Sequence, residues 1–257
     1  MNSSKTYKSV TDFKTGDTVI TVSKLQKSFG PKKVLYDFDL ELKKGENLVV
    51  LGRSGSGKSV LIKCIIGLLK SDGGKIDVLG NDIGELDHIG LDLIRARVGF
   101  LFQSNALYDS MTVRENLEFP MRRHLTHLSA EEVETKILET LTNVGLANTI
   151  DLMPAELSGG MQKRIALART LILHPEIILY DEPTTGLDPV TGREISSLMV
   201  DVQEKYKTSS IIISHDMKCV EITSDRIIVL IDGKCYASGT YEDLSKSTDE
   251  KVKQFFE

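Results

Sequence analysis

The sequence predicts an α/β fold in which a mainly parallel sheet follows an antiparallel β subdomain and is interrupted by a helical subdomain. Apolar runs at residues 48–51, 176–180 and 209–214 are typical of buried strands. Residues 18–42 contain short strand patterns separated by turn residues. The interval 104–156 has little strand signal and a helical pattern. These three observations indicate the architecture.

In chain order, residues 19–22 and 34–42 predict two strands, with a turn at residues 30–33. Further along, residues 75–79 alternate like a strand. Residues 99–103 predict another strand that ends on a polar residue. The β subdomain and the first part of the main sheet are therefore expected before residue 104.

The segment after the strand at 48–51 fits the phosphate-binding pattern G-x-x-x-x-G-K-[ST], and an apolar helix is predicted after it at residues 60–69. This arrangement directs backbone N–H groups and the positive end of the helix dipole at one point. Lys58 is expected to reach the β- and γ-phosphates, and the Ser59 hydroxyl to bind Mg²⁺. The predicted nucleotide-binding residues are Gly52, Arg53, Ser54, Gly55, Ser56, Gly57, Lys58, Ser59 and Val60.

Two carboxylates and a histidine follow buried strands. Asp181 ends one strand and suits Mg²⁺ bound through water, whereas Glu182 can polarise a water for attack on the γ-phosphate. Acidic pairs after strands are often only helix caps, but a phosphate loop in the same chain favours a site. His215 follows another strand, where a neutral imidazole can bond the γ-phosphate.

Gln103 and Phe29 each have two interpretations. A glutamine after a strand is usually a solvated loop residue, but Gln103 in a nucleotide site can touch Mg²⁺ or the attacking water. Phe29 stands at the predicted turn and either plugs the hairpin or stacks on an adenine ring. The sequence alone leaves both alternatives open.

Two helix starts carry recognisable signals. Ser129 and Glu132 form a capping box that opens an amphipathic helix. A second strongly predicted helix begins after Ser158, Gly159 and Gly160, and its N-terminus is suited to bind an anion. An ordinary serine N-cap would give the same sequence pattern.

Composition excludes some classes of function. The net charge of −5 argues against a nucleic-acid binder. The three cysteines lack the spacing of a metal-binding motif, which indicates reduced thiols. No apolar run reaches the length of a membrane span.

Residues 1–17 are expected to form a flexible N-terminal tail, and residues 241–257 a C-terminal tail. The final aromatics, Phe255 and Phe256, either pack on their own chain or contact a neighbouring subunit.

The order of these motifs resembles that of the ATP-binding-cassette (ABC) ATPases over about residues 18–240. The resemblance implies a P-loop NTPase core with a RecA-like sheet, an ABC ATPase domain at 18–240 and a helical subdomain at about 104–156. It also implies a head-to-tail homodimer in which ATP and Mg²⁺ lie between the phosphate loop of one copy and the signature of the other. That signature comprises Leu157, Ser158, Gly159, Gly160, Met161 and Gln162.

The resemblance also implies roles for single residues. Phe29 is similar to the adenine-stacking aromatic, and Asp188 to the D-loop residue at the dimer seam. The implied catalytic residues are Glu182 as general base, His215 as switch histidine, and Gln103. The implied metal-side residues are Ser59, Gln103 and Asp181.

A narrower resemblance links the chain to ATPases that work with MCE-type lipid transporters. Residues 58–63, 101–110, 119–120 and 154–161 carry it, with Val60 and Met161 where other ABC ATPases usually have Thr and Gln. This branch includes the Mla phospholipid system. It implies an integral inner-membrane permease resembling MlaE and an MCE-domain lipid-binding protein resembling MlaD, and it leaves room for a small regulatory subunit. The ATPase would then lie at the cytoplasmic face of the bacterial inner membrane, attached through the permease.

Two rival functions use the same nucleotide chemistry. One is the ATPase of an ABC importer or exporter for another solute. The other is a soluble ABC protein that acts on nucleic acid, which usually shows a long coiled-coil insertion, a second cassette or a basic face. None of these is evident in the sequence, so no nucleic-acid partner is expected.

Overall fold

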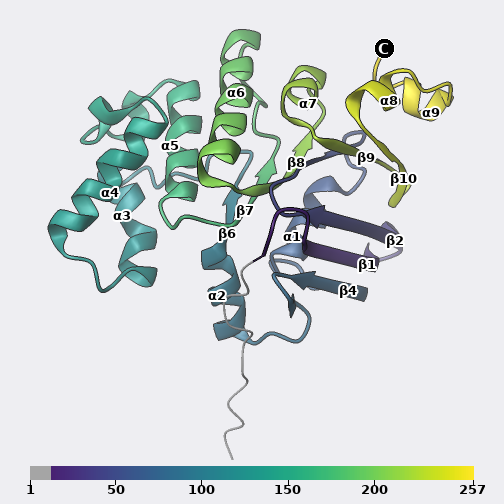
Figure 1. The fold of residues 1–257 in the computed structure, drawn as a ribbon, viewed down its shortest axis with the longest axis horizontal. Coiled ribbons are helices and arrows are strands. Elements are labelled where there is room, and N and C mark those ends of the chain that lie inside the picture. Colours follow the sequence, from purple (N-terminus) through teal and green to yellow (C-terminus); the bar gives the residue numbers. More distant parts are fainter. Residues whose placement is uncertain (1–12) are drawn as a thin grey trace, which may run out of the picture.

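The computed structural model describes residues 13–257, and its first sheet is an antiparallel β subdomain (Figure 1). Its strand order is β2-β1-β4-β5. The hairpin strands are longer than predicted, because pairing continues to the turn at Gly30 and Pro31. The strands are β1 (Thr18–Phe29), β2 (Lys32–Lys43), β4 (Gly73–Val78) and β5 (Asn81–Asp82).

The second sheet is mainly parallel and has the order β10-β9-β3-β8-β7-β6. Only the pair of β9 and β10 is antiparallel. The carboxyl ends of the parallel strands therefore share one edge, where ligands bind in folds of this kind. The strands are β3 (Asn47–Leu51), β6 (Val98–Leu101), β7 (Ile177–Asp181), β8 (Ser209–Ser214), β9 (Arg226–Ile231) and β10 (Lys234–Gly239).

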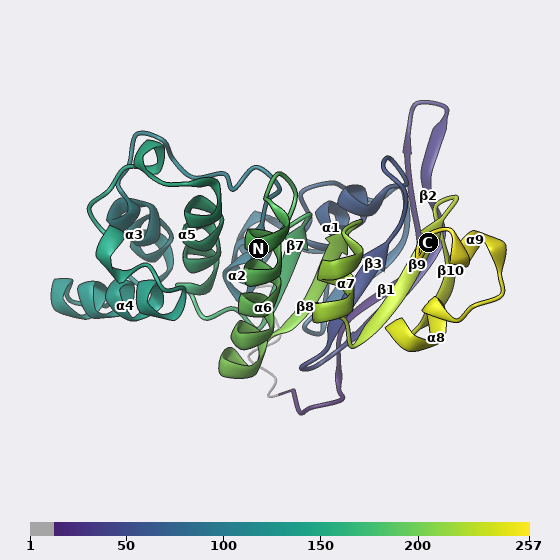
Figure 2. The ribbon, with the colours of Figure 1, turned by 90° about the horizontal axis from the view of Figure 1, so that it is seen from above.

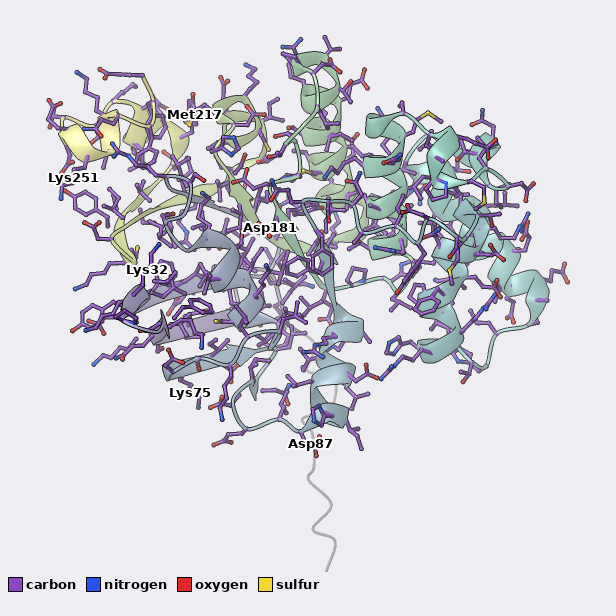
Figure 3. The ribbon with its side chains drawn as sticks, turned by 180° about the vertical axis from the view of Figure 1, so that it is seen from behind. Lys32, Lys75, Asp87, Asp181, Met217 and Lys251 are labelled. Atoms are coloured by element: carbon purple, nitrogen blue, oxygen red, sulfur yellow. The ribbon has the colours of Figure 1, made fainter. Side chains whose placement is uncertain are left out.

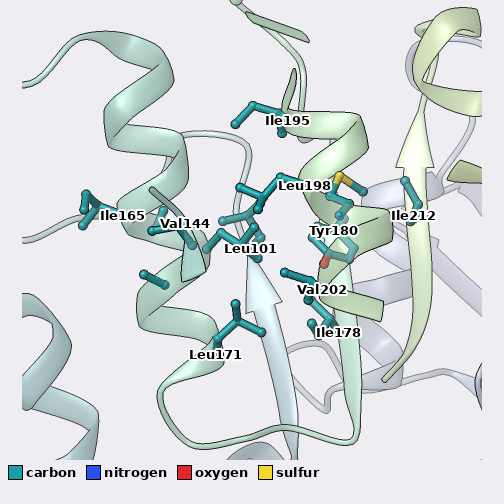
Figure 4. Close-up of a cluster of buried hydrophobic side chains, with 14 of the residues drawn as sticks. Leu101, Val144, Ile165, Leu171, Ile178, Tyr180, Ile195, Leu198, Val202 and Ile212 are labelled. Carbon is teal, nitrogen blue, oxygen red and sulfur yellow. The ribbon is translucent and has the colours of Figure 1, made fainter. Parts of the chain in front are cut away.

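The parallel sheet is buried on both faces, which explains why its strands appear as continuous apolar runs. On β7, Ile178 and Tyr180 pack into one cluster of buried side chains, and Ile177 and Leu179 pack into another. This alternation follows from the two-residue period of a strand. The first cluster also takes side chains from α5 and α6 (Figure 4).

Helices cover the parallel sheet and form a separate group beyond its β6 edge. Figures 1 and 2 show α3, α4 and α5 together at one end of the molecule, and α8 and α9 at the other. The helices are α1 (Lys58–Ile65), α2 (His88–Arg97), α3 (Val113–His124), α4 (Ala130–Asn143), α5 (Gly159–Leu171), α6 (Pro189–Tyr206), α7 (Met217–Thr223), α8 (Tyr241–Ser245) and α9 (Glu250–Lys253), with 3₁₀ turns at Ala147–Thr149 and Pro154–Glu156.

Two predicted elements end earlier than expected. The helix predicted at 60–69 ends at Ile65, and Gly67 soon after it has a φ of +69°, which does not continue a right-handed helix. The strand predicted at 99–103 ends at Leu101, so Gln103 lies beyond the strand on an exposed loop. The capping box of Ser129 and Glu132 is present at the start of α4, as predicted.

The chain ends are more structured than the predicted tails. Residues 1–12 of the expected N-terminal tail lie outside the described residues, whereas residues 13–17 form a turn in which the Asp17 carbonyl accepts from Lys44 N at 2.8 Å. The expected C-terminal tail forms α8 and α9, and Phe255 and Phe256 pack against the core of the same chain. Within residues 13–257, no helix is both long and apolar enough to cross a bilayer.

Candidate functional site

The phosphate loop connects β3 to α1, as the sequence predicts. Gly57 is the N-cap of α1, with a φ of +106°, and no side chain caps the helix. A Cβ at Gly57 would lie 2.8 Å from Val34 Cγ1, so both the backbone conformation and the space require glycine. The first N–H groups of α1 therefore remain available to an anion.

Lys58 stands at the centre of this loop and is only 5% exposed. Its Nζ donates to the Gly52 carbonyl at 2.8 Å and to the Arg53 carbonyl at 3.2 Å. The same Nζ lies 3.7 Å from Glu182 Oε1. Burial lowers the pKa of Lys58, and the charges of Glu182 and Asp181 oppose that shift. The loop therefore holds a buried ammonium group beside two carboxylates.

Ser59 and Asp181 come together although 122 residues separate them in the chain. Ser59 Oγ donates to Asp181 Oδ1 at 2.8 Å. Burial raises the pKa of Asp181, which is 5% exposed at the end of β7, near the centre of the molecule in Figure 3. A hydroxyl and a carboxylate are oxygen ligands of the kind that Mg²⁺ prefers. These two residues therefore fit the predicted metal site.

Glu182 lies one residue beyond β7 and contacts His215 directly. Its Oε2 is 2.6 Å from His215 Nδ1 and 3.4 Å from Thr185 Oγ1. Glu182 has a φ of +52°, which is uncommon for a residue with a side chain. Its backbone N–H donates to the Ile213 carbonyl of β8 at 3.0 Å. With this backbone geometry the Glu182 carboxylate contacts both Lys58 and His215.

Thr184 and Asp216 form a second connection between the same two loops. Thr184 is 7% exposed, and its Oγ1 donates to Asp216 Oδ2 at 2.9 Å. Asp216 also caps α7 by accepting from the backbone N–H groups of Lys218 and Cys219. No sequence pattern predicted this pair. The position of Asp216 next to His215 was the only signal available.

Lys163 is a further buried cation that the sequence analysis missed. It is 2% exposed, and its Nζ donates to the Gln103 carbonyl at 3.0 Å. Burial lowers its pKa to about 8, while the charge of Asp181 opposes the shift. The structure therefore brings the backbone of Gln103 close to the carboxylate edge, although the Gln103 residue itself is exposed.

The predicted signature begins α5 and contacts the start of α6. Ser158 caps α5 by accepting from Met161 N at 3.3 Å, and Asp188 caps α6 through Val190 N and Thr191 N. A Cβ at Gly160 would lie 2.6 Å from Thr191 Cγ2, so a larger residue there would have to displace the Thr191 side chain. The signature positions are Leu157, which is buried, and Ser158, Gly159, Gly160, Met161 and Gln162, which remain accessible.

The signature and the phosphate loop lie apart within one chain. Figure 2 shows α6 and β7 between α5 and α1. Among the described residues, no hydrogen bond joins Ser158, Gly159 or Gly160 to the phosphate loop. The structure therefore gathers Lys58, Ser59, Asp181, Glu182 and His215 at one edge and leaves the signature elsewhere.

A hollow of about 720 Å³ opens beside the phosphate loop. It is lined by Arg53, Ser54, Gly55 and Ser56, and by cationic side chains that include Lys32 and Lys251. Phe29 is not among its lining residues; it ends β1, is 49% exposed, and has Lys27 Nζ 5.3 Å from its ring centroid. This exposure is inconsistent with Phe29 as a buried hairpin plug.

Comparison with known proteins decides which family this arrangement represents. The family model described as "ABC transporter" matches residues 35–185. The chain belongs to the ABC transporter family. This result confirms the family predicted from the sequence, and the likeness to solved ABC cassettes confirms the P-loop core with its antiparallel β subdomain.

Individual ABC proteins are similar over most of the chain. The intermembrane phospholipid transport system ATP-binding protein MlaF of Haemophilus influenzae is 42% identical, over 87% of this chain and 84% of that protein. The probable ribonucleotide transport ATP-binding protein mkl of Mycobacterium leprae is 39% identical, over 92% of this chain and 68% of that protein. The solved ABC cassette MJ0796, a dimer bound to ADP and Pi after hydrolysis, has 33% identity and a TM-score of 0.78, with 86% of this chain and 98% of that chain covered. The chain described in this structure is accordingly an ABC ATPase, which binds and hydrolyses ATP.

Proposed function

We propose that this ABC cassette is the ATP-hydrolysing subunit of a transporter that moves phospholipid between bacterial membranes, of the Mla or MCE type. The likeness to MlaF at 42% identity is the observation that carries the substrate class. Val60 and Met161, the two positions that resemble MCE-type ATPases, are consistent with it. The likeness to mkl, named for ribonucleotide transport, marks another solute as the second candidate.

In the proposed site, different side chains of this chain have separate roles in ATP hydrolysis. Lys58 and the start of α1 bind the phosphates, and Phe29 stacks on the adenine. Ser59, Asp181 and Gln103 would hold Mg²⁺, and the bound ion would neutralise charge on the phosphates. Glu182 takes a proton from the attacking water. The 2.6 Å contact of His215 with Glu182 supports this role, because it orients the carboxylate.

Each site is completed by a second copy of the chain. Ser158, Gly159 and Gly160 are accessible at the start of α5, and α6 and β7 lie between α5 and α1, the helix that follows the phosphate loop (Figure 2). In a head-to-tail homodimer they would face the partner's nucleotide, with Asp188 at the seam. ATP then stabilises the closed dimer, and hydrolysis removes the contacts that favour closure.

An apolar groove offers a surface for the permease. It has a volume of about 530 Å³ and lies where β6, the segment after α1, the end of α2, α3 and the end of α5 meet. Leu68, Tyr108 and Phe119 line it and are 47%, 42% and 44% exposed. Exposed large apolar side chains in one groove are typical of a binding surface. We propose that cytoplasmic helices of an MlaE-like permease bind there, beside Gln103.

We infer the remaining partners and the location from the likeness to MlaF and the MCE-type resemblance. The permease would attach the cassette to the cytoplasmic face of the bacterial inner membrane and connect it to an MlaD-like MCE-domain protein, with a small regulatory subunit as a further candidate partner.

The test is affinity capture of the full chain from detergent-solubilised membranes, followed by lipid analysis of the complex. Recovery of a multi-span permease, an MCE-domain protein and phospholipid is the expected result. A permease with a small polar solute would instead support the second candidate. Recovery of ribosomes or DNA without a permease would overturn the proposal. A cassette with both Tyr108→Ala and Phe119→Ala is the matched variant, because it should keep ATP binding and lose the permease.

A further inference from the structure

The loop after β6 contains two consecutive residues in an unusual backbone conformation. Asn105 has a φ of +61° and Ala106 a φ of +53°. Side-chain-bearing residues rarely adopt this left-handed region, and such a conformation persists only where the surroundings impose it. The loop joins Gln103, in the proposed ATP site, to Tyr108, in the proposed permease groove.

Two cations of α5 hold this loop by its carbonyl oxygens. Arg169 Nη1 donates to the Ala106 carbonyl at 2.8 Å, and Arg169 Nη2 reaches the Asn105 carbonyl at 3.3 Å. Lys163, nearer the start of the same helix, donates to the Gln103 carbonyl at 3.0 Å. The planar guanidinium suits a pair of carbonyls on adjacent residues, because its donors have a fixed spacing.

The far end of the loop is also fixed, and it connects to the groove. The Arg169 guanidinium carbon lies 5.6 Å from the centroid of the Tyr108 ring, which in turn lies 4.8 Å from the Phe119 ring of α3. Asn116, fully buried on α3, accepts from Tyr108 N at 2.9 Å and donates to the Tyr108 carbonyl at 3.1 Å. A continuous chain of contacts thus runs from α5 through the loop to the groove.

We propose that Arg169 is a positioning residue that holds residues 103–108 in this conformation and makes the loop move with α5. This inference rests on the proposed function, because α5 begins at Ser158, which would face the partner's nucleotide. A displacement of Ser158 on dimer closure is transmitted along the helix to three loop carbonyls. Gln103 and Tyr108 are thereby shifted together, so ATP binding and the shape of the groove change in one step.

The test compares Arg169→Gln with Arg164→Gln in the full chain. Arg164 lies on the same helix, donates to the Val144 carbonyl and pairs with Glu194 at 2.8 Å, but among the described residues it forms no hydrogen bond or ion pair with the loop. For Arg169→Gln we expect amide exchange at residues 103–108 to rise at least about tenfold. We also expect kcat to fall about tenfold with KM within about twofold, because the coupling and not the nucleotide pocket is lost. Arg164→Gln should leave loop exchange unchanged.

Arg169→Lys is the second variant and keeps the proposal testable if Arg169→Gln does not fold. Lysine retains the charge but cannot bond two carbonyls as a planar fork, so we expect intermediate exchange and intermediate kcat. Unchanged exchange at residues 103–108 in the folded Arg169 variants would overturn the inference, as would faster exchange with normal kcat. These measurements need no permease. Failure to capture a permease would therefore count against the proposed transport function, but it would not affect the conclusion on Arg169.

Discussion

His215 Nδ1 lies 2.6 Å from Glu182 Oε2, while the other oxygen of the same carboxylate lies 3.7 Å from Lys58 Nζ. Three loops, at the ends of β3, β7 and β8, therefore meet at one carboxylate. Glu182, the proposed base, therefore lies between Lys58, which is proposed to bind phosphate, and His215.

Glu182→Gln should remove hydrolysis and keep ATP binding. The amide keeps the shape of the side chain but is a poor base, so turnover should fall by about 10²- to 10⁴-fold. Measurement of turnover, ATP affinity and dimer formation checks this, with the ATP-bound dimer expected to accumulate. Glu176→Gln, at the other end of the same strand and paired with Arg97, is the control. A normal rate in Glu182→Gln would remove this residue from the role of base.

Gly57→Ala should weaken nucleotide binding by about tenfold or more, because the loop must move to accommodate a Cβ and alignment of its donors is lost. The added Cβ would meet Val34 Cγ1 at 2.8 Å in a backbone with φ of +106°. Gly16→Ala is matched for conformation, with φ of +91° and nothing within 4 Å. It should cost about 1 kcal/mol of folding stability and leave ATP affinity unchanged. Titration calorimetry and urea unfolding distinguish these effects. Equal ATP affinity in the two variants would contradict the inference that a Cβ at Gly57 has no room beside Val34.

Ser158→Ala should lower turnover more than loss of a helix cap explains. Ser158 and Ser129 are both N-cap serines, of α5 and α4. Replacement of either should cost about 1 kcal/mol of stability. Only Ser158 is expected to touch the partner's nucleotide, so Ser129→Ala should retain turnover. If Ser158→Ala hydrolysed ATP as fast as Ser129→Ala, the shared site would be untenable.

Lys163→Met should stabilise the protein and slow hydrolysis. Burial lowers the Lys163 pKa from 10.5 to about 8, so the charged form is less favourable in the folded than in the unfolded chain. A tenfold change in an acid dissociation constant corresponds to about 1.4 kcal/mol. Because Lys163→Met also removes the hydrogen bond to the Gln103 carbonyl, we expect the free energy of unfolding at pH 7 to rise by about 1 to 3 kcal/mol. Turnover should fall because the Gln103 carbonyl loses its donor.

The stabilisation expected from Lys163→Met should decrease as the pH rises. A lowered pKa in the folded chain means that the cost of the buried charge is fully present below pH 8 and disappears as the pH rises toward 10.5. The advantage of Lys163→Met in urea unfolding should therefore shrink over that interval. A gain that stayed constant, or grew, from pH 8 to pH 10 would show that Lys163 is not buried as an ammonium group.

The local patterns determined much of this protein from the sequence. The phosphate loop, the strand before Asp181 and the cap at Ser158 are encoded in residues that are neighbours in the chain, so periodicity and capping signals predict them. The family and the α/β core followed from the order of these motifs and are confirmed.

Only the tertiary structure decided which groups meet. The contacts of Ser59 with Asp181, of Thr184 with Asp216 and of Lys163 with the Gln103 carbonyl join elements that are distant in sequence. The left-handed turn at Ala106 and its bond to Arg169 likewise have no local signature, because alanine carries no turn signal. Such contacts depend on the order of strands in the sheet and on how helices pack across it, which a one-dimensional pattern does not specify. The sequence by itself therefore determined the nucleotide-binding motifs, and packing determined how they are connected.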